Sequence, residues 1–178
     1  MPVYKFSNKD WLSALMAILF TLFAVTALAE PAKFAPVVPD HALVFPKDYG
    51  AHPDFRLEWW YVTGWLETPD KKSWGFQITF FRSATSHHPD NPSQFSPRQL
   101  IIAHVALSDP AAGKLMHAEK VAREGFDLVY ARQTDTDVKL DGWYFVRLED
   151  GRYQLDMQAD NFGLQLSLTP TQDMILQG

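Results

Sequence analysis

The sequence predicts an all-β domain, an antiparallel barrel or half-barrel of about seven to nine strands. Three observations favour this class. From residue 56 onward, apolar residues recur with a period of two and not with the 3.6-residue period of a helix. The same segments are rich in aromatic and β-branched residues, which fit a pleated surface. Tight-turn pairs, Asp150-Gly151 and Asp160-Asn161, separate consecutive segments as they do in antiparallel hairpins.

The first 29 residues have the three parts of a secretory signal. Lys5 and Lys9 give a basic start, residues 11–27 are almost entirely apolar, and Ala27-Leu28-Ala29 offers the small residues that signal peptidase requires. An uncleaved membrane anchor is the alternative, because the apolar run is long. The absence of cysteine excludes lipid attachment at a signal-peptide cysteine. We therefore expect a periplasmic or secreted protein of the bacterial cell envelope.

A proline-rich leader, residues 30–55, is expected to connect the signal to the folded domain. Proline has no backbone N–H to donate, so a segment with this many prolines is predicted to be extended and to wrap or link. We expect regular structure to begin near Arg56. The prolines are Pro31, Pro36, Pro39, Pro46 and Pro53.

The first half of the domain predicts three strands. Residues 56–67 and 73–82 form a hairpin in this interpretation, and a long polar, proline-broken loop follows over residues 83–98. The nearly apolar run over residues 99–109 predicts a strand that is buried on both faces or lines a cavity. Residues 114–139 are less regular, and we expect one or two short strands there.

The second half predicts a meander of three strands, over residues 142–149, 152–159 and 162–169. Apolar and polar residues alternate regularly in these strands. We therefore expect one solvent-exposed face and one buried face, as in an antiparallel sheet that curls around a core. Residues 173–178 begin a further apolar segment and then stop. This ending indicates a chain that is truncated at its C-terminus.

Composition excludes several functional classes. The chain carries 16 basic and 21 acidic residues with no basic cluster, which argues against nucleic acid and anionic membrane surfaces as partners. It has no cysteine, and it contains no G-x-S-x-G, P-loop or G-x-G-x-x-G motif. His87-His88-x-Asp90 has no third spaced ligand, so we expect no metal and no other cofactor.

Residues 50–64 are the densest group of side chains that could carry chemistry. Alternation places Glu58 and Trp60 on one face of a strand, and Trp59 and Tyr61 on the other. If the Glu58 face is interior, it holds a desolvated carboxyl group, which can serve as a proton donor. In the alternative interpretation the tryptophans anchor the core, and Glu58 is exposed or salt-bridged.

Arg82 and His104 are the other polar candidates. Arg82 ends a predicted strand on its apolar face, where an arginine usually closes a barrel end with a carboxylate partner, and Glu58 is the candidate partner. His104 lies in an apolar run, where a satisfied core histidine is the alternative to a catalyst. The functional hypothesis is that Glu58, Arg82 and His104 meet inside the barrel and form a polar patch in an aromatic cavity, the usual composition of a small-molecule pocket.

Three motifs in a fixed order resemble those of one family. They are F-P-x-D-x-G-x-H-P-x-F-R-x-E-W-W-Y-V-T-G over residues 45–64, G-F-Q-I-T-F-F-R over residues 75–82 and A-H-V-A-L-S-D over residues 103–109. Together they resemble the AttH-like, carotenoid-hydratase-like family, often labelled secreted hydrolases. The resemblance implies two lipocalin-like β-barrels in tandem. Residues 56–178 would then form the first barrel, and the missing second barrel would be its intramolecular partner.

The resemblance also implies candidate activities and residue roles. Family activities include water addition to a carbon–carbon double bond of polyene or terpenoid-like substrates, and ring-forming reactions on polyketide-like ones. We favour an exported protein that binds a lipid-, terpenoid- or polyketide-like molecule and passes it to a membrane transporter. The first alternative is a hydratase or hydrolase-like enzyme, in which Glu58 protonates an alkene and electron-rich rings stabilise the carbocation. The second is a fragment that folds poorly. The matching positions are Glu58 and His104 as catalytic candidates, and Trp59, Trp60, Tyr61 and Arg82 as ligand-binding candidates.

Overall fold

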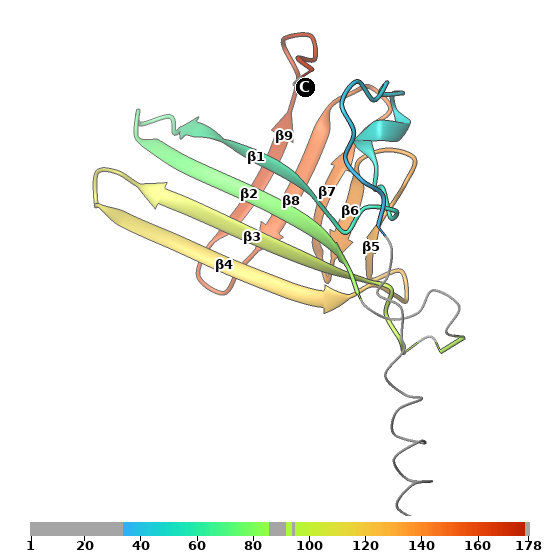
Figure 1. The fold of residues 1–178 in the computed structure, drawn as a ribbon. Helices are drawn as coiled ribbons and strands as arrows, with labels where there is room; N and C mark the ends of the chain where they lie inside the picture. The colour runs from blue at the N-terminus through green and yellow to red at the C-terminus, as the bar shows by residue number, and fades with distance from the viewer. Residues whose placement is uncertain (1–33, 86–91, 94, 177–178) are drawn as a thin grey trace, which may run out of the picture. The chain divides into compact units, whose positions relative to one another are not determined.

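The computed structural model describes residues 34–85, 92–93 and 95–176, and in them the chain forms two antiparallel sheets (Figure 1). Within each sheet, every strand pairs with its neighbours in sequence, and the long strands of the first sheet cross those of the second. Sheet A consists of β1 (Leu57–Glu67), β2 (Ser73–Ala84), β3 (Gln99–Asp109) and β4 (Lys114–Arg123), in that order. Sheet B consists of β5 (Val129–Ala131), β6 (Asp137–Leu140), β7 (Trp143–Arg147), β8 (Tyr153–Gln158) and β9 (Gly163–Leu168).

The all-β class predicted from the sequence is confirmed. Nine strands fall within the described residues, and the helical structure there is a single 3-10 turn, η1 (Lys47–Tyr49). Six predicted strands are present with ends that differ by at most two residues. The prediction for residues 114–139 was wrong, because three strands form there. The strand β4 is ten residues long, and its inward side includes Ala118 and Ala122, whose small side chains give a weak apolar signal.

The core lies between the two sheets. Sheet A contributes residues of β2 and β3, and sheet B contributes Trp143 together with residues of β5 to β9. The Trp143 ring is fully buried, and its Nε1 donates a hydrogen bond to the carbonyl of Gln158 at 2.7 Å. The most buried apolar residues are Ile78, Phe80, Ile101, Ala103, Val105, Val138, Leu140, Trp143, Leu155 and Met157.

Only one face of sheet A meets this core. On β3, Ile101, Ala103 and Val105 are buried, whereas the alternate residues point outward and are partly or largely exposed. Of the two alternatives expected for residues 99–109, burial on both faces was therefore wrong. The physical reason is that sheet B covers one face of sheet A, so most side chains on the other face meet solvent, with Thr79 as an exception.

The described part of the leader is not simply extended. It contains turns and η1, and the N–H of Ala51 donates to the carbonyl of Arg132 at 2.7 Å. Gly50 permits this contact, since a Cβ at that position would lie 2.6 Å from the carbonyl carbon of Gln133. The leader is thus attached to the start of sheet B.

Within the described residues, no helix is long and apolar enough to span a membrane. The predicted signal over residues 1–29 lies outside the described residues.

Candidate functional site

A cleft of about 580 Å³ lies where the edge strand β1 and the leader face sheet B. One part of its wall is aromatic and apolar, and includes Tyr49, Trp60, Phe145, Tyr153 and Leu168. Another part is polar, and is formed by Asp48, His52, Glu58 and Thr136. The cleft is therefore bounded by elements from three places in the chain: the leader, β1 and sheet B.

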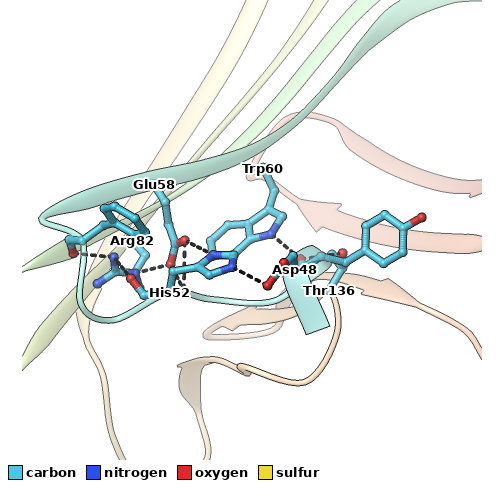
Figure 2. Close-up of polar contacts among 8 residues, drawn as sticks. Asp48, His52, Glu58, Trp60, Arg82 and Thr136 are labelled. Carbon is cyan, nitrogen blue, oxygen red and sulfur yellow. Dashed lines mark hydrogen bonds and ion pairs between the residues drawn. The ribbon is translucent and has the colours of Figure 1, made fainter. Parts of the chain in front are cut away.

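Four of the polar side chains near the cleft form a continuous chain, which we call the polar cluster: Asp48, His52, Glu58 and Arg82 (Figure 2). Arg82 is fully buried and its Nε donates to the Glu58 carboxylate. The imidazole of His52 lies between two carboxylates, with Nδ1 3.0 Å from Glu58 and Nε2 3.2 Å from Asp48. The cluster thus runs from the interior of the domain to the wall of the cleft.

Strand register and leader contacts bring the polar cluster together. Glu58 on β1 lies opposite Arg82 on β2, and both side chains point to the inner face. The Nη2 of Arg82 donates to the carbonyls of His52 at 2.8 Å and Phe55 at 2.7 Å. The backbone N–H of His52 donates to Glu58 at 2.7 Å. Arg82 and Glu58 therefore hold the end of the leader against sheet A.

Tyr49 joins the leader to both sheets. Its carbonyl accepts a hydrogen bond from the Trp60 Nε1 at 2.9 Å and another from the Thr136 hydroxyl at 3.1 Å. Trp60 belongs to β1, and Thr136 is a buried residue immediately before β6. These two bonds fix the width of the cleft between β1 and sheet B.

Two groups on the cleft wall have shifted acidities. Hydrogen bonds from the N–H of Val44 and from the His52 ring hold the pKa of Asp48 below its ordinary value. Burial raises the pKa of the Tyr153 phenol, and the neighbouring Tyr49 adds to this shift while Arg147 opposes it. Asp48 therefore presents a carboxylate to His52, and Tyr153 presents a neutral hydroxyl group to the cleft.

The geometry shows the salt-bridged arrangement that the sequence allowed for Glu58 and Arg82. Both oxygens of Glu58 are engaged: Oε1 accepts from the Arg82 Nε and the His52 backbone N–H, and Oε2 lies within hydrogen-bond distance of the His52 backbone N–H and Nδ1. A general acid would instead have to present its proton to a substrate in the cleft. The role of Glu58 as an acid remains a prediction. Arg82 does not itself line the cleft; it contacts two residues that do, the Glu58 carboxylate and the His52 carbonyl.

His104 does not meet Glu58 and Arg82, so that part of the functional hypothesis was wrong. The register pairs Arg82 with Ile101 and His104 with Thr79, which places His104 on the outer face of sheet A. Its side chain is 52% exposed and its Nε2 lies 3.7 Å from Glu119. A catalytic role in the cleft is therefore not supported by its position, because the sheet itself separates His104 from the polar cluster.

The three aromatic candidates of β1 divide between the two faces of the sheet. Trp60 points inward and helps to form the cleft wall. Trp59 and Tyr61 belong to the outer face, where they are 56% and 61% exposed, and they border the cleft at its rim. Ligand contact by these residues remains a prediction, with Trp60 the best placed.

Sequence reasoning did not single out several residues of the site. Asp48 and His52 lie in the first family motif, so their pattern could have suggested them. Phe145 and Tyr153 show only the alternation of ordinary core positions, and Thr136 shows no signal. His87, His88 and Asp90 lie outside the described residues, and the part of the chain that the structure describes contains no group of three or more acidic or histidine side chains suited to a metal ion.

A family model and a solved structure with the same description both match this chain. A family model described as AttH-like matches residues 36–178. The crystal structure of a presumed AttH from Nitrosomonas europaea is 65% identical in sequence, with a TM-score of 0.71, and the match covers 82% of this chain and 43% of that one. This chain thus spans less than half the length of that protein. Among curated proteins, none matches significantly.

Proposed function

Because this chain belongs to the AttH-like family, we propose that it is an exported protein that binds an apolar small molecule in the cleft between β1 and sheet B. The observation that carries this proposal is the composition of the cleft. Aromatic and aliphatic side chains of the leader, β1 and sheet B converge on it, and a small polar cluster lies at one end. Small-molecule sites typically combine an apolar wall with a few fixed polar groups.

The dimensions of the cleft agree with such a ligand. Its volume of about 580 Å³ falls within the range of roughly 300–1,000 Å³ that is usual for small-molecule sites. The two hydrogen bonds to the Tyr49 carbonyl hold its walls in place before a ligand arrives. A preformed site loses less free energy to ordering when it binds.

The signal-like start of the chain supports export, which would expose the cleft to envelope lipids and secreted metabolites. Lipid-, terpenoid- and polyketide-like molecules are the proposed ligand classes. A membrane transporter that supplies or receives the ligand is a proposed partner. The Nitrosomonas protein is more than twice as long as the segment that matches this chain. We propose that a second β domain in such longer chains is the intramolecular partner of this one.

Binding can be tested with N-phenyl-1-naphthylamine, a neutral apolar dye that fluoresces when it leaves water. We expect saturable binding by the purified protein. Leu168→Asp places a charge in the cleft wall and should weaken binding by about tenfold or more, since burying an unpaired carboxylate is costly. Val121→Asp is the matched control, because Val121 is 65% exposed on the outer face of sheet A.

Binding that does not saturate would contradict the proposal, as would equal loss in Leu168→Asp and Val121→Asp. Native mass spectrometry of the protein gives an independent measurement. A stoichiometric apolar molecule that co-purifies, and keeps its mass during incubation, supports a binding protein.

The polar cluster favours one alternative, an enzyme that adds water to a carbon–carbon double bond. Glu58 would transfer a proton to one alkene carbon, water would attack the other carbon, and the oxonium formed would return its proton to the carboxylate. The Trp60 ring, on the cleft wall, would stabilise the cation. Incubation with an acyclic polyene should then yield a product heavier by one water, and Glu58→Gln should abolish this product while it preserves dye binding. A polyene recovered unchanged would contradict the alternative.

A further inference from the structure

A second hollow continues the cleft and ends at a cationic group. It has a volume of about 260 Å³, and it shares Tyr49, Tyr153, Thr169 and Pro170 with the wall of the cleft. Its remaining wall is formed by Arg147, Asp150, Gly151 and Arg152, and the charges of Asp150 and Arg152 are paired with each other. The two hollows therefore adjoin, and we call them together the groove: the polar cluster lies on the wall of the first hollow, and Arg147 and the Arg152–Asp150 pair lie on the wall of the second.

Arg147 is the arginine that is built into this groove. Its guanidinium carbon lies 4.7 Å from the centre of the Tyr49 ring, and its Nη1 donates to Asp135 at 2.9 Å. The side chain is 22% exposed, compared with 47% for Arg152, which pairs with Asp150. A guanidinium carries five N–H donors, so one bond to Asp135 leaves donors for another acceptor. Partial burial also reduces the screening of its charge by water.

Tyr153 provides a second donor beside Arg147. The two side chains both line the second hollow, and burial raises the pKa of the phenol, which keeps it in its neutral, proton-carrying form. Arg147 also keeps its positive charge. Desolvation lowers its pKa, but the hydrogen bond and the charge of Asp135 raise it by more, so the net shift of the pKa is upward. An oxyanion in the second hollow could therefore accept from both a guanidinium and a hydroxyl group.

The opposite end of the groove is unsuited to an anion. Asp48 and Glu58 line it, and their partners His52 and Arg82 are already engaged with them. An acidic ligand would therefore place its charged group at Arg147 and its apolar body along the rings between the two ends. The difference in charge between the two ends therefore favours the orientation with the head group at Arg147 over the orientation with the head group at the polar cluster.

We propose that the groove takes an amphiphile with a carboxylate head group, of the kind represented by a long-chain fatty acid, and that Arg147 and Tyr153 bind the carboxylate. This inference rests on the proposed apolar-ligand function and specifies its ligand class. Arg147 shares its donors between Asp135 and the ligand, and a planar guanidinium matches the geometry of a carboxylate.

Displacement of N-phenyl-1-naphthylamine by two ligands with the same alkyl chain tests the proposal. We expect sodium dodecanoate to bind the wild-type protein about tenfold more tightly than dodecan-1-ol. Arg147→Gln should reduce this preference to near equality, because dodecanoate loses a charged partner whereas dodecan-1-ol loses at most a hydrogen bond to a neutral hydroxyl group.

Arg132→Gln is the matched control. Arg132 also lies over a tyrosine ring, Tyr130 at 4.1 Å, and also pairs with an aspartate, Asp127 at 3.1 Å, but it does not line the groove. Its replacement should preserve the preference for dodecanoate. Arg147→Lys keeps the positive charge and should retain part of the preference, which provides a measurement if Arg147→Gln lowers the unfolding temperature.

The outcomes separate the two proposals. Equal affinity of the wild-type protein for dodecanoate and dodecan-1-ol overturns the carboxylate inference and leaves the apolar-ligand function standing. Failure of both ligands and of the dye to bind overturns the proposed function itself. A parallel loss of both ligands in Arg147→Gln, or a full preference in that variant, overturns the role of Arg147.

Discussion

The inner and outer faces of sheet A are built from alternate residues of the same four strands, and both are rich in apolar side chains. On the inner face, Phe80 and Ile101 are fully buried against sheet B. On the outer face, the register aligns one apolar residue from each strand in a row across the sheet: Trp59, Phe81, Ile102 and Val121. Trp59 and Val121 are more than half exposed.

This difference teaches that apolar content does not by itself identify the buried face. The apolar residues of both faces satisfy the same β-propensity and alternation rules. Sheet B covers only one of them, so only that face gains the free energy of apolar burial. An apolar row left in solvent is also the kind of surface that associates with other molecules.

The largest contrast is expected for two adjacent residues of β2. Phe80→Ala removes a fully buried ring and should lower the free energy of unfolding by about 3–5 kcal/mol. Phe81→Ala, on the outer face, should cost about 1 kcal/mol. Urea unfolding followed by tryptophan fluorescence measures both. Equal losses would show that the outer face is buried in solution.

The second prediction concerns a buried charge on the inner face of sheet A, that of Arg82. Arg82→Met leaves the Glu58 carboxylate without its guanidinium partner, and the expected loss is about 3 kcal/mol, the lower end for breaking a buried pair, because Glu58 keeps its contacts with His52. Arg123→Met, at the outer face, should change stability by less than about 1 kcal/mol. If the two variants unfold at the same urea concentration, the buried pair does not stabilise the fold.

A smaller effect is expected from Glu124, just after β4. Burial raises the pKa of Glu124 above 4.5, and the charges of Arg82, Arg132 and Arg98 oppose this shift. The folded state therefore holds the proton more tightly than the unfolded state, and stability is lost as pH rises from about 4.5 through the folded pKa.

Glu124→Gln removes this titration. Between pH 4 and pH 7, the unfolding temperature of the wild-type protein should fall relative to that of the variant. A difference that stays constant over this range would exclude Glu124 as the source of the pH dependence.

The smallest effect is expected at His104. Its exposed pair with Glu119 spans 3.7 Å, so His104→Ala should change stability by no more than about 0.5 kcal/mol. Binding of N-phenyl-1-naphthylamine in the cleft should not change, since His104 lies on the opposite face of the sheet. A loss of dye binding comparable to that of Leu168→Asp would place His104 in the site after all.

Much of the local structure was predictable because it depends on neighbours in the chain. Alternation and turn residues defined six of the strands to within two residues, and the shared face of Arg82 with Phe80 suggested its pairing with Glu58. The strand β4 was missed as a long strand because alanines on its inner side give little contrast with its polar neighbours. The family resemblance likewise depended on contiguous motifs, and the family model confirmed it.

The site, by contrast, depended on tertiary structure. Sequence alternation determined that His104 and its neighbours on β3 have two faces, but a one-residue change of register exchanges those faces, and only the pairing with β2 decided the outcome. Similarly, Tyr49 and Thr136 are 87 positions apart in sequence, and no local pattern relates them. Packing of sheet B against one side of sheet A decided which side chains are buried. Contact of the leader with both sheets formed the cleft. Both outcomes depend on the free energy of contacts between segments that are distant in sequence, and no local pattern encodes such contacts.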